Sequence, residues 1–261
     1  MLRPRIIPCL LVHRGGLVKT INFKDGKYVG DPINAVRIFN EKEVDEIVVL
    51  DIDATSEGRE PNYELIRKLS AECRMPLCYG GGITALDQAE RIISMGVEKV
   101  ALSAAAINDP SIIARLAEVI GRQSVVAVID VLKSGMFRKY EAVTHNGSKR
   151  TGVNPISLAK QFEQLGAGEI IVNSVDQDGT MNGFDIKLVQ SVREAINIPM
   201  TALGGAGSLE DLGTLLEECG HIGVAAGSLF VFKGKYRAVL INYPNRQQKD
   251  SVFRAAKALA V

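Results

Sequence analysis

The sequence predicts a single α/β domain over residues 1–261, a (β/α)8 barrel with an internal half-barrel repeat. Three observations predict this fold. Eight short apolar segments alternate with amphipathic helical segments, and continuous apolar runs are typical of parallel strands covered on both faces. Motifs of the first half of the chain recur in the second half. A length of 261 residues is also ordinary for one such barrel.

The predicted strands are short and spread along the whole chain. They are residues 5–12, 46–52, 76–80, 99–103, 125–130, 169–175, 199–204 and 222–227. Helix signals fall between them. Asp31 is a good N-cap followed by Pro32 at the first helical position, and Ser208 caps a second helix that ends at Gly220. Eight strands separated by helices favour a closed barrel over a doubly wound sheet.

The internal repeat relates the two halves of the chain at an offset of about 120 residues. The segment PLCYGGGI from Pro76 resembles PMTALGGAG from Pro199, and EIVVLDIDA resembles EIIVNSVDQ. The strand RIIPCLL aligns in the same way with VVAVID. Leu11 and Asp130 therefore occupy equivalent places, near the end of the first strand of each half.

Charge and residue types exclude several classes of protein. The net charge of +1 gives no electrostatic basis for binding nucleic acid or a membrane, and no apolar run reaches the roughly 18–20 residues of a membrane span. The cysteines are Cys9, Cys73, Cys78 and Cys219, and the histidines are His13, His145 and His221. Neither set has metal-site spacing, so we expect reduced thiols, a cytoplasmic location and no metal or organic cofactor.

Acidic residues follow several of the predicted strands, where the active sites of barrels lie. They are Asp51, Asp53, Asp130, Asp176 and Asp178. An acid in such a place can also cap the next helix, and this alternative stays open for each residue taken singly. Five acids on one rim favour a functional site.

Glycine-rich turns follow the third, seventh and eighth strands, at residues 79–83, 203–208 and 224–230. Glycine lets the backbone approach a ligand, and the amides at a helix N-terminus favour phosphate. Two such turns related by the repeat predict two phosphate sites and a ligand phosphorylated at both ends. Simple tight turns are the alternative.

Two further segments have distinct patterns. Residues 133–152 predict a small excursion after the fifth strand, in which Asn146 and Gly147 suit a two-residue hairpin turn. Residues 242–250 are polar and predict a loop.

Five motifs, RIIPCL, VVLDI, GGGI, DQDGTMNGFD and GGAG, occur in order at the predicted strands. Together they resemble the cyclase subunit of imidazole glycerol phosphate synthase, and the resemblance covers nearly the whole chain. It implies a barrel that binds a bis-phosphorylated ribonucleotide. It also implies that ammonia, made by a separate glutaminase subunit, passes through the barrel interior. Two aspartates then act as acid and base in forming imidazole glycerol phosphate and an aminoimidazole carboxamide ribotide.

The resemblance assigns roles to individual residues. Asp130 matches the catalytic aspartate of the fifth strand, and Lys19 matches the first-loop lysine that closes over substrate. One phosphate site is implied at Gly82 and Ser103, and the other at Asp178, Gly179, Gly205, Ala226 and Gly227. The ring that gates ammonia is implied at Arg5, Glu46, Lys99 and Glu169. For each ring residue a surface ion pair is the alternative.

Two departures from the family pattern bear on activity. The first-strand aspartate is replaced by Leu11, and the Asn-Thr pair of the first phosphate site is replaced by Ser103-Ala104. Leucine cannot transfer a proton, and a positioned acid or base contributes roughly a hundredfold to ten-thousandfold in rate. The combination is similar to a branch of paralogs found with surface-polysaccharide genes. That similarity implies ammonia delivery to a third protein, which makes an acetamidino group on a nucleotide-linked sugar.

Two alternatives follow from the same residues. The first is an active cyclase of histidine biosynthesis that has recruited Asp51 or Asp178 in place of the missing acid. The second is a structural or phosphate-binding partner with neither transport nor catalysis. The charged ring disfavours the second alternative, and Leu11 disfavours the first.

Overall fold

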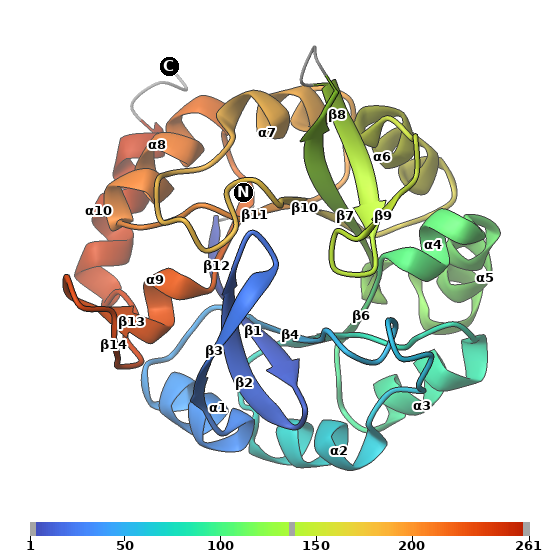
Figure 1. Ribbon diagram of the computed structural model, residues 1–261, viewed down its shortest axis with the longest axis horizontal. Coiled ribbons are helices and arrows are strands. Elements are labelled where there is room, and N and C mark those ends of the chain that lie inside the picture. The colour runs from blue at the N-terminus through green and yellow to red at the C-terminus, as the bar shows by residue number, and fades with distance from the viewer. Residues whose placement is uncertain (1–3, 136–138, 258–261) are drawn as a thin grey trace.

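The computed structural model describes residues 4–135 and 139–257, and it forms the predicted (β/α)8 barrel (Figure 1). The eight barrel strands are parallel and pair in a closed circle, because the fifth of them, β7, also pairs with β10. In chain order they are β1 (Arg5–His13), β4 (Ile47–Asp51), β5 (Leu77–Gly80), β6 (Lys99–Leu102), β7 (Val125–Ser134), β10 (Glu169–Ser174), β11 (Met200–Leu203) and β12 (Gly223–Ala226). The prediction of the fold class is confirmed.

Helices form an outer ring around the strands (Figure 1). They are α1 (Pro32–Glu41), α2 (Tyr63–Glu72), α3 (Leu86–Ser94), α4 (Ala104–Asn108), α5 (Ser111–Ile120), α6 (Pro155–Gln164), α7 (Ile186–Arg193), α8 (Leu209–Cys219), α9 (Ser228–Val231) and α10 (Arg246–Lys257). The predicted caps are present. Asp31 accepts a hydrogen bond from the amide of Asn34 at 2.9 Å, and Ser208 forms a capping box with Asp211.

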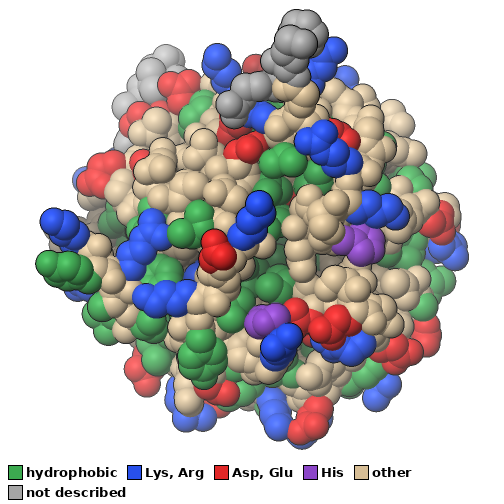
Figure 2. All heavy atoms as spheres, in the orientation of Figure 1, with side chains coloured by type: hydrophobic (Ala, Val, Ile, Leu, Met, Phe, Trp, Pro, Cys, Tyr) green, Lys and Arg blue, Asp and Glu red, His purple; other side chains and the backbone are tan. Residues whose placement is uncertain are grey.

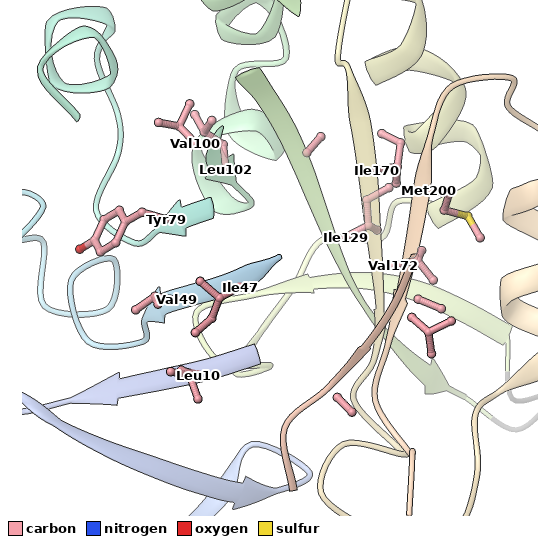
Figure 3. Packing of buried hydrophobic residues seen from close by; sticks show 14 of the residues in the cluster. Leu10, Ile47, Val49, Tyr79, Val100, Leu102, Ile129, Ile170, Val172 and Met200 are labelled. Carbon is pink, nitrogen blue, oxygen red and sulfur yellow. The ribbon is translucent and has the colours of Figure 1, made fainter. Parts of the chain in front are cut away.

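Strict alternation along the strands separates two apolar cores. Outward-facing residues, among them Leu10, Val49 and Ile170, pack against the helices (Figure 3). Inward-facing residues fill the lumen of the barrel as a second cluster: Ile7, Cys9, Val48, Cys78, Ala101, Val126, Val128, Ile171, Leu203 and Ala225. Successive side chains of a strand point to opposite faces, so each strand contributes to both cores.

Two hairpins leave the barrel at the carboxyl ends of β1 and β7 and extend over its mouth (Figure 1). The first consists of β2 (Gly16–Ile21) and β3 (Lys24–Gly30), and the second of β8 (Lys139–Thr144) and β9 (Lys149–Arg150). A third, β13 (Phe232–Lys233) with β14 (Ala238–Val239), follows α9. Asn22 anchors the first hairpin by donating to the carbonyls of Val175 and Asp176 at 3.0 and 2.7 Å.

Two local predictions are wrong. The turn between β8 and β9 has four residues, because Thr144 pairs with Lys149 and the backbone is left-handed at His145, Asn146 and Gly147. In the predicted two-residue turn, only Asn146 and Gly147 would lie between the paired residues of the two strands. The segment 242–250 also continues into a helix, since α10 begins at Arg246 and packs on α8.

Gly179 is expected to be required for docking of the first hairpin. It has a φ of +70°, and a Cβ there would lie 1.9 Å from the carbonyl oxygen of Thr20. We predict that Gly179→Ala lowers the free energy of unfolding by roughly 1–3 kcal/mol, measured by urea denaturation. Gly15→Ala is the matched control, since its φ is +80° but a Cβ would meet nothing within 4 Å. Equal losses in the two variants would show that contact with Thr20 is unimportant.

Candidate functional site

A ring of charged side chains closes the amino end of the barrel. Arg5 contacts both Glu46 and Glu169, with 2.7 Å between its Nη2 and Oε1 of Glu169. Lys99 Nζ lies 2.8 Å from Glu46 and 2.9 Å from Glu169, which completes the ring. Arg5, Lys99 and Glu169 are the first residues of their strands, and Glu46 directly precedes β4. The structure therefore brings together the four residues that sequence analysis assigned to a gate.

Electrostatics keep the ring fully charged. Burial alone would raise the pKa of Glu169, but the charges and hydrogen bonds of Arg5 and Lys99 outweigh it and lower this pKa to about 2. In the same way, burial would lower the pKa of Lys99, and the two carboxylates raise it. Thr201, which the sequence analysis missed, donates to Glu169 at 2.6 Å. Its inward position at the start of β11 is the signal that could have identified it.

The other end of the barrel opens into a cavity of about 160 Å³. Figure 2 shows this face, where hydrophobic side chains in the central hollow lie between charged ones. The residues predicted to bind or transform a ligand all line the cavity: Lys19, Gly82, Ser103, Asp130, Asp178, Gly179, Gly205, Ala226 and Gly227. Leu11 lines it too. Residues from both halves of the chain thus converge on one site.

Asp130 projects into the cavity from β7 and is held by neighbours on both sides. Asn173 Nδ2 donates to its Oδ1 at 2.9 Å, and Ser103 lies 3.5 Å from its Oδ2. Burial raises the pKa of Asp130 to about 6, although the hydrogen bond from Asn173 opposes the shift, and the charge of Asp178 adds to it. A carboxyl group of this kind is suited to exchange protons near neutral pH. Sequence analysis missed Asn173. It lies four residues after the inward-pointing Glu169 on the same strand, and side-chain alternation therefore predicts that it points into the barrel as well.

Lys19 lies folded into the cavity rather than out in solvent. Its ammonium donates to the carbonyl of Cys9, and burial lowers its pKa against the opposing influence of Cys9 and Asp178. It packs on Gly227, where a Cβ would lie 2.2 Å from Lys19 Nζ. Glycine at this position is therefore what lets the lysine reach the floor of the cavity.

Two of the five rim acids, Asp51 and Asp53, organise the loops after β1 and β4. Asp51 accepts hydrogen bonds from the amides of Asp53 and Ala54, at 3.0 and 3.1 Å. Asp53 accepts from the His13 ring and from the amide of Arg14, both at 2.7 Å. These bonds tie the β1–β2 turn to the end of β4.

The remaining rim acids differ in role. Asp176 accepts from the amide of Lys133 at 2.8 Å and so holds the start of the second hairpin. Asp178, whose pKa is raised by burial, accepts from Thr20 at 3.0 Å and lines the cavity together with Asp130. The alternative that these acids bind backbone amides therefore applies to Asp51, Asp53 and Asp176, although the amides they bind are not those of a helix N-terminus.

Other expectations concern metals, thiols and membranes. Over residues 4–135 and 139–257 no three His, Cys, Asp or Glu side chains lie close enough together to hold a metal ion. All four cysteines are free thiols, and Cys9 and Cys78 are buried in the lumen. Within the described part of the chain no helix has the length and apolar character needed to cross a membrane.

Comparisons with known proteins identify the family. The model of the histidine biosynthesis protein family matches residues 5–237. The chain belongs to this family. A relative from Leptospira borgpetersenii, provisionally named imidazole glycerol phosphate synthase subunit HisF, is 58% identical over 97% of this chain and 100% of its own length.

More distant family members carry the same subunit name. A provisionally named third HisF subunit of Vibrio vulnificus is 54% identical over 95% of this chain and 96% of its own length. The imidazole glycerol phosphate synthase subunit HisF of Hyphomonas neptunium is 41% identical over 89% of this chain and 91% of its own length. The family that the sequence motifs resemble is confirmed.

The raised pKa of Asp130 makes stability depend on pH. The unfolded carboxyl ionises near pH 4 and the folded one near pH 6, so wild-type stability relative to Asp130→Asn falls across this interval and is constant above it. We predict that Asp130→Asn is more stable than wild type by roughly 1–3 kcal/mol at pH 7.5, with most of this gain absent at pH 4. Urea denaturation at both pH values measures the difference. A gain of equal size at pH 4 and 7.5 would contradict the assignment.

Proposed function

We propose that this protein is the synthase subunit of a cytoplasmic glutamine amidotransferase complex, which receives ammonia from a glutaminase subunit through the barrel. The observation that carries the proposal is the sequence of environments along the lumen: a charged ring, then an apolar interior, then a polar cavity. An apolar passage suits neutral ammonia, whereas an ion would lose its hydration there. The relatives' names, which describe a subunit of imidazole glycerol phosphate synthase, support a partner subunit.

The glutaminase is proposed to dock on the amino-end face, around the charged ring. Arg5 and Lys99 retain partial exposure, with side chains 28% and 18% accessible, while the two carboxylates are nearly inaccessible. A partner can therefore contact the cations and weaken their bonds to Glu46 and Glu169. Opening of the ring on contact would admit ammonia to the lumen only when the partner is bound.

The chemistry at the mouth is proposed to differ from that of the histidine pathway. Leu11 lines the cavity at the position where the family resemblance implies an aspartate, and the residue paired with it on β4 is Leu50. Together with the resemblance to the surface-polysaccharide branch, this supports ammonia delivery for an acetamidino group in the synthesis of lipopolysaccharide O-antigen. A third protein would then make that group on a nucleotide-linked sugar.

An active cyclase of histidine biosynthesis is the second candidate. It is favoured by the proximity of Asp178 and Asp51 to Asp130, since all three line one cavity and a second acid is therefore at hand. Asp51 uses one carboxylate oxygen for loop amides, and Asp178 accepts a hydrogen bond from Thr20. Part of the hydrogen-bonding capacity of each carboxylate is therefore already in use.

Turnover with the family's ribonucleotide and ammonium ions distinguishes the two candidates. We expect the wild-type chain to be at least about a hundredfold slower than a Leu11→Asp variant, because a missing proton donor costs about that factor. Formation of the aminoimidazole product is followed by absorbance. If wild type turns over robustly, the cyclase candidate is correct. If both proteins are inactive, the reaction has left this barrel and only ammonia delivery remains.

Removal of Lys99 should uncouple glutamine use from ammonia use in the complex with a glutaminase. Lys99→Ala leaves Glu46 and Glu169 with Arg5 alone, which opens one side of the ring. We expect more ammonia to escape into solution per glutamine hydrolysed, with activity on added ammonium salts retained. Released ammonia is measured with a coupled dehydrogenase. Arg115→Ala, which breaks an exposed pair with Asp109, is the control. Equal loss with both nitrogen sources would count against a gate.

A further inference from the structure

The titratable side chains that line the mouth cavity differ in how fully their polar atoms are hydrogen-bonded. Its titratable residues are Cys9, Lys19, Asp51, Asp130, Asp178 and His145. Among the described residues, the first five are tied to backbone or buried partners, or lie sealed in the lumen. Within residues 4–135 and 139–257, His145 has a hydrogen-bond partner at one ring nitrogen only, the Thr144 hydroxyl 3.0 Å from Nδ1. Its Nε2 is therefore available to a ligand.

The turn that carries His145 is held in a fixed and uncommon conformation. His145 and Asn146 have φ values of +53° and +54°, a region that side-chain-bearing residues rarely adopt. Ser148 donates to the His145 carbonyl through both its amide and its hydroxyl, at 3.1 and 2.6 Å. Asn146 reaches across the mouth and donates to the carbonyl of Ile52 at 2.9 Å. Strain that is supported on several sides points to a positioned functional group.

The Thr144 hydroxyl determines which proton the ring presents. Thr144 is 2% exposed, and within the described chain its hydroxyl contacts no acceptor besides His145 Nδ1. A buried hydroxyl donates where an acceptor is available, so Nδ1 accepts and the proton of the ring lies on Nε2. His145 therefore presents an N–H donor to the cavity, in both the neutral and the protonated ring.

We propose that His145 is the proton-donating group of the mouth cavity and contacts the phosphorylated ligand there, supplying what Leu11 lacks. The inference rests on the cyclase candidate under Proposed function for the existence of that ligand. Asp130, from the same β7–β9 unit, is the complementary acceptor. As the incoming nitrogen forms its bond to a carbon of the ligand, the Asp130 carboxylate takes a proton from that nitrogen, and the protonated ring gives a proton to the oxygen or nitrogen whose bond to the same carbon breaks. Asp130 then releases its proton to water, and His145 regains one from water.

Charged groups around the turn must be considered for its pH dependence. The turn packs on the first hairpin at Phe23 and on the β10–α7 segment at Val175, and Lys19 and Asp178 line the same cavity as His145. On the β4 side Asn146 donates to the carbonyl of Ile52, which stands between Asp51 and Asp53 in the chain, and these two acids are bound by loop amides and by His13.

The test follows the imidazole signals of the full chain by NMR while ligand is added. Each signal is assigned with His13→Gln, His145→Gln and His221→Gln, and the two probes are inorganic phosphate and the family's bis-phosphorylated ribonucleotide. We expect the ribonucleotide to shift the His145 signal, and His145→Gln to weaken its binding about tenfold. The loss should persist above neutral pH, because the ring donates from Nε2 whether or not it is protonated. His221→Gln, exposed and before β12, should bind as wild type does.

The outcomes separate this inference from the proposed function. A His145 shift with phosphate but no binding of the ribonucleotide would retain the donor role and reject the proposed ligand. Ribonucleotide binding that leaves the His145 signal unmoved, or an unchanged affinity in His145→Gln, would overturn the inference and leave the proposed function standing. Response to neither probe would overturn the inference and the cyclase candidate, and would leave ammonia delivery standing.

Discussion

Closure of the barrel is the constraint on which the rest of the site depends. Once β7 pairs with β10, every second side chain of each strand must point into a lumen reached by water only from its ends. Along β1 the inward residues are Arg5, Ile7, Cys9 and Leu11. The strand thus contributes first a charge to the ring, then apolar side chains to the lumen, and last a side chain to the mouth cavity. The position of a residue along its strand therefore decides whether it belongs to the ring, the interior or the cavity.

The charged ring is better explained by function than by stability. Its two glutamates are buried, and the cost of removing such charges from water commonly equals or exceeds the gain from pairing them. An apolar layer would close the end of the barrel as firmly. Two cations shared by two carboxylates, however, form an arrangement that can open on one side while the remaining pairs stay formed. A gate for a small neutral molecule needs that property, and an apolar plug lacks it.

Apolar patterning made the fold predictable from the sequence, and the family resemblance implied most of the cavity. Continuous apolar runs located all eight strands, and the nine residues implied by the resemblance converge because they lie at or beyond the carboxyl ends of those strands. Asn173 and Thr201 were missed because a single polar residue inside an apolar run has no distinct pattern. The β8–β9 turn was mispredicted because its shape depends on tertiary bonds, such as that of Asn146 to Ile52, which no local signal encodes.

The internal repeat shows how the mouth has become asymmetric. Leu11 and Leu50 are paired residues on the neighbouring strands β1 and β4. By the internal repeat they are equivalent to Asp130 and Asn173, which are paired on β7 and β10. One half thus contributes an apolar pair where the other contributes a hydrogen-bonded carboxyl and amide. The amino-end ring divides differently, since each half supplies a glutamate while both cations, Arg5 and Lys99, come from the first half. The proton chemistry that we propose therefore concentrates on the β7–β10 side, while the proposed passage beneath it needs both halves.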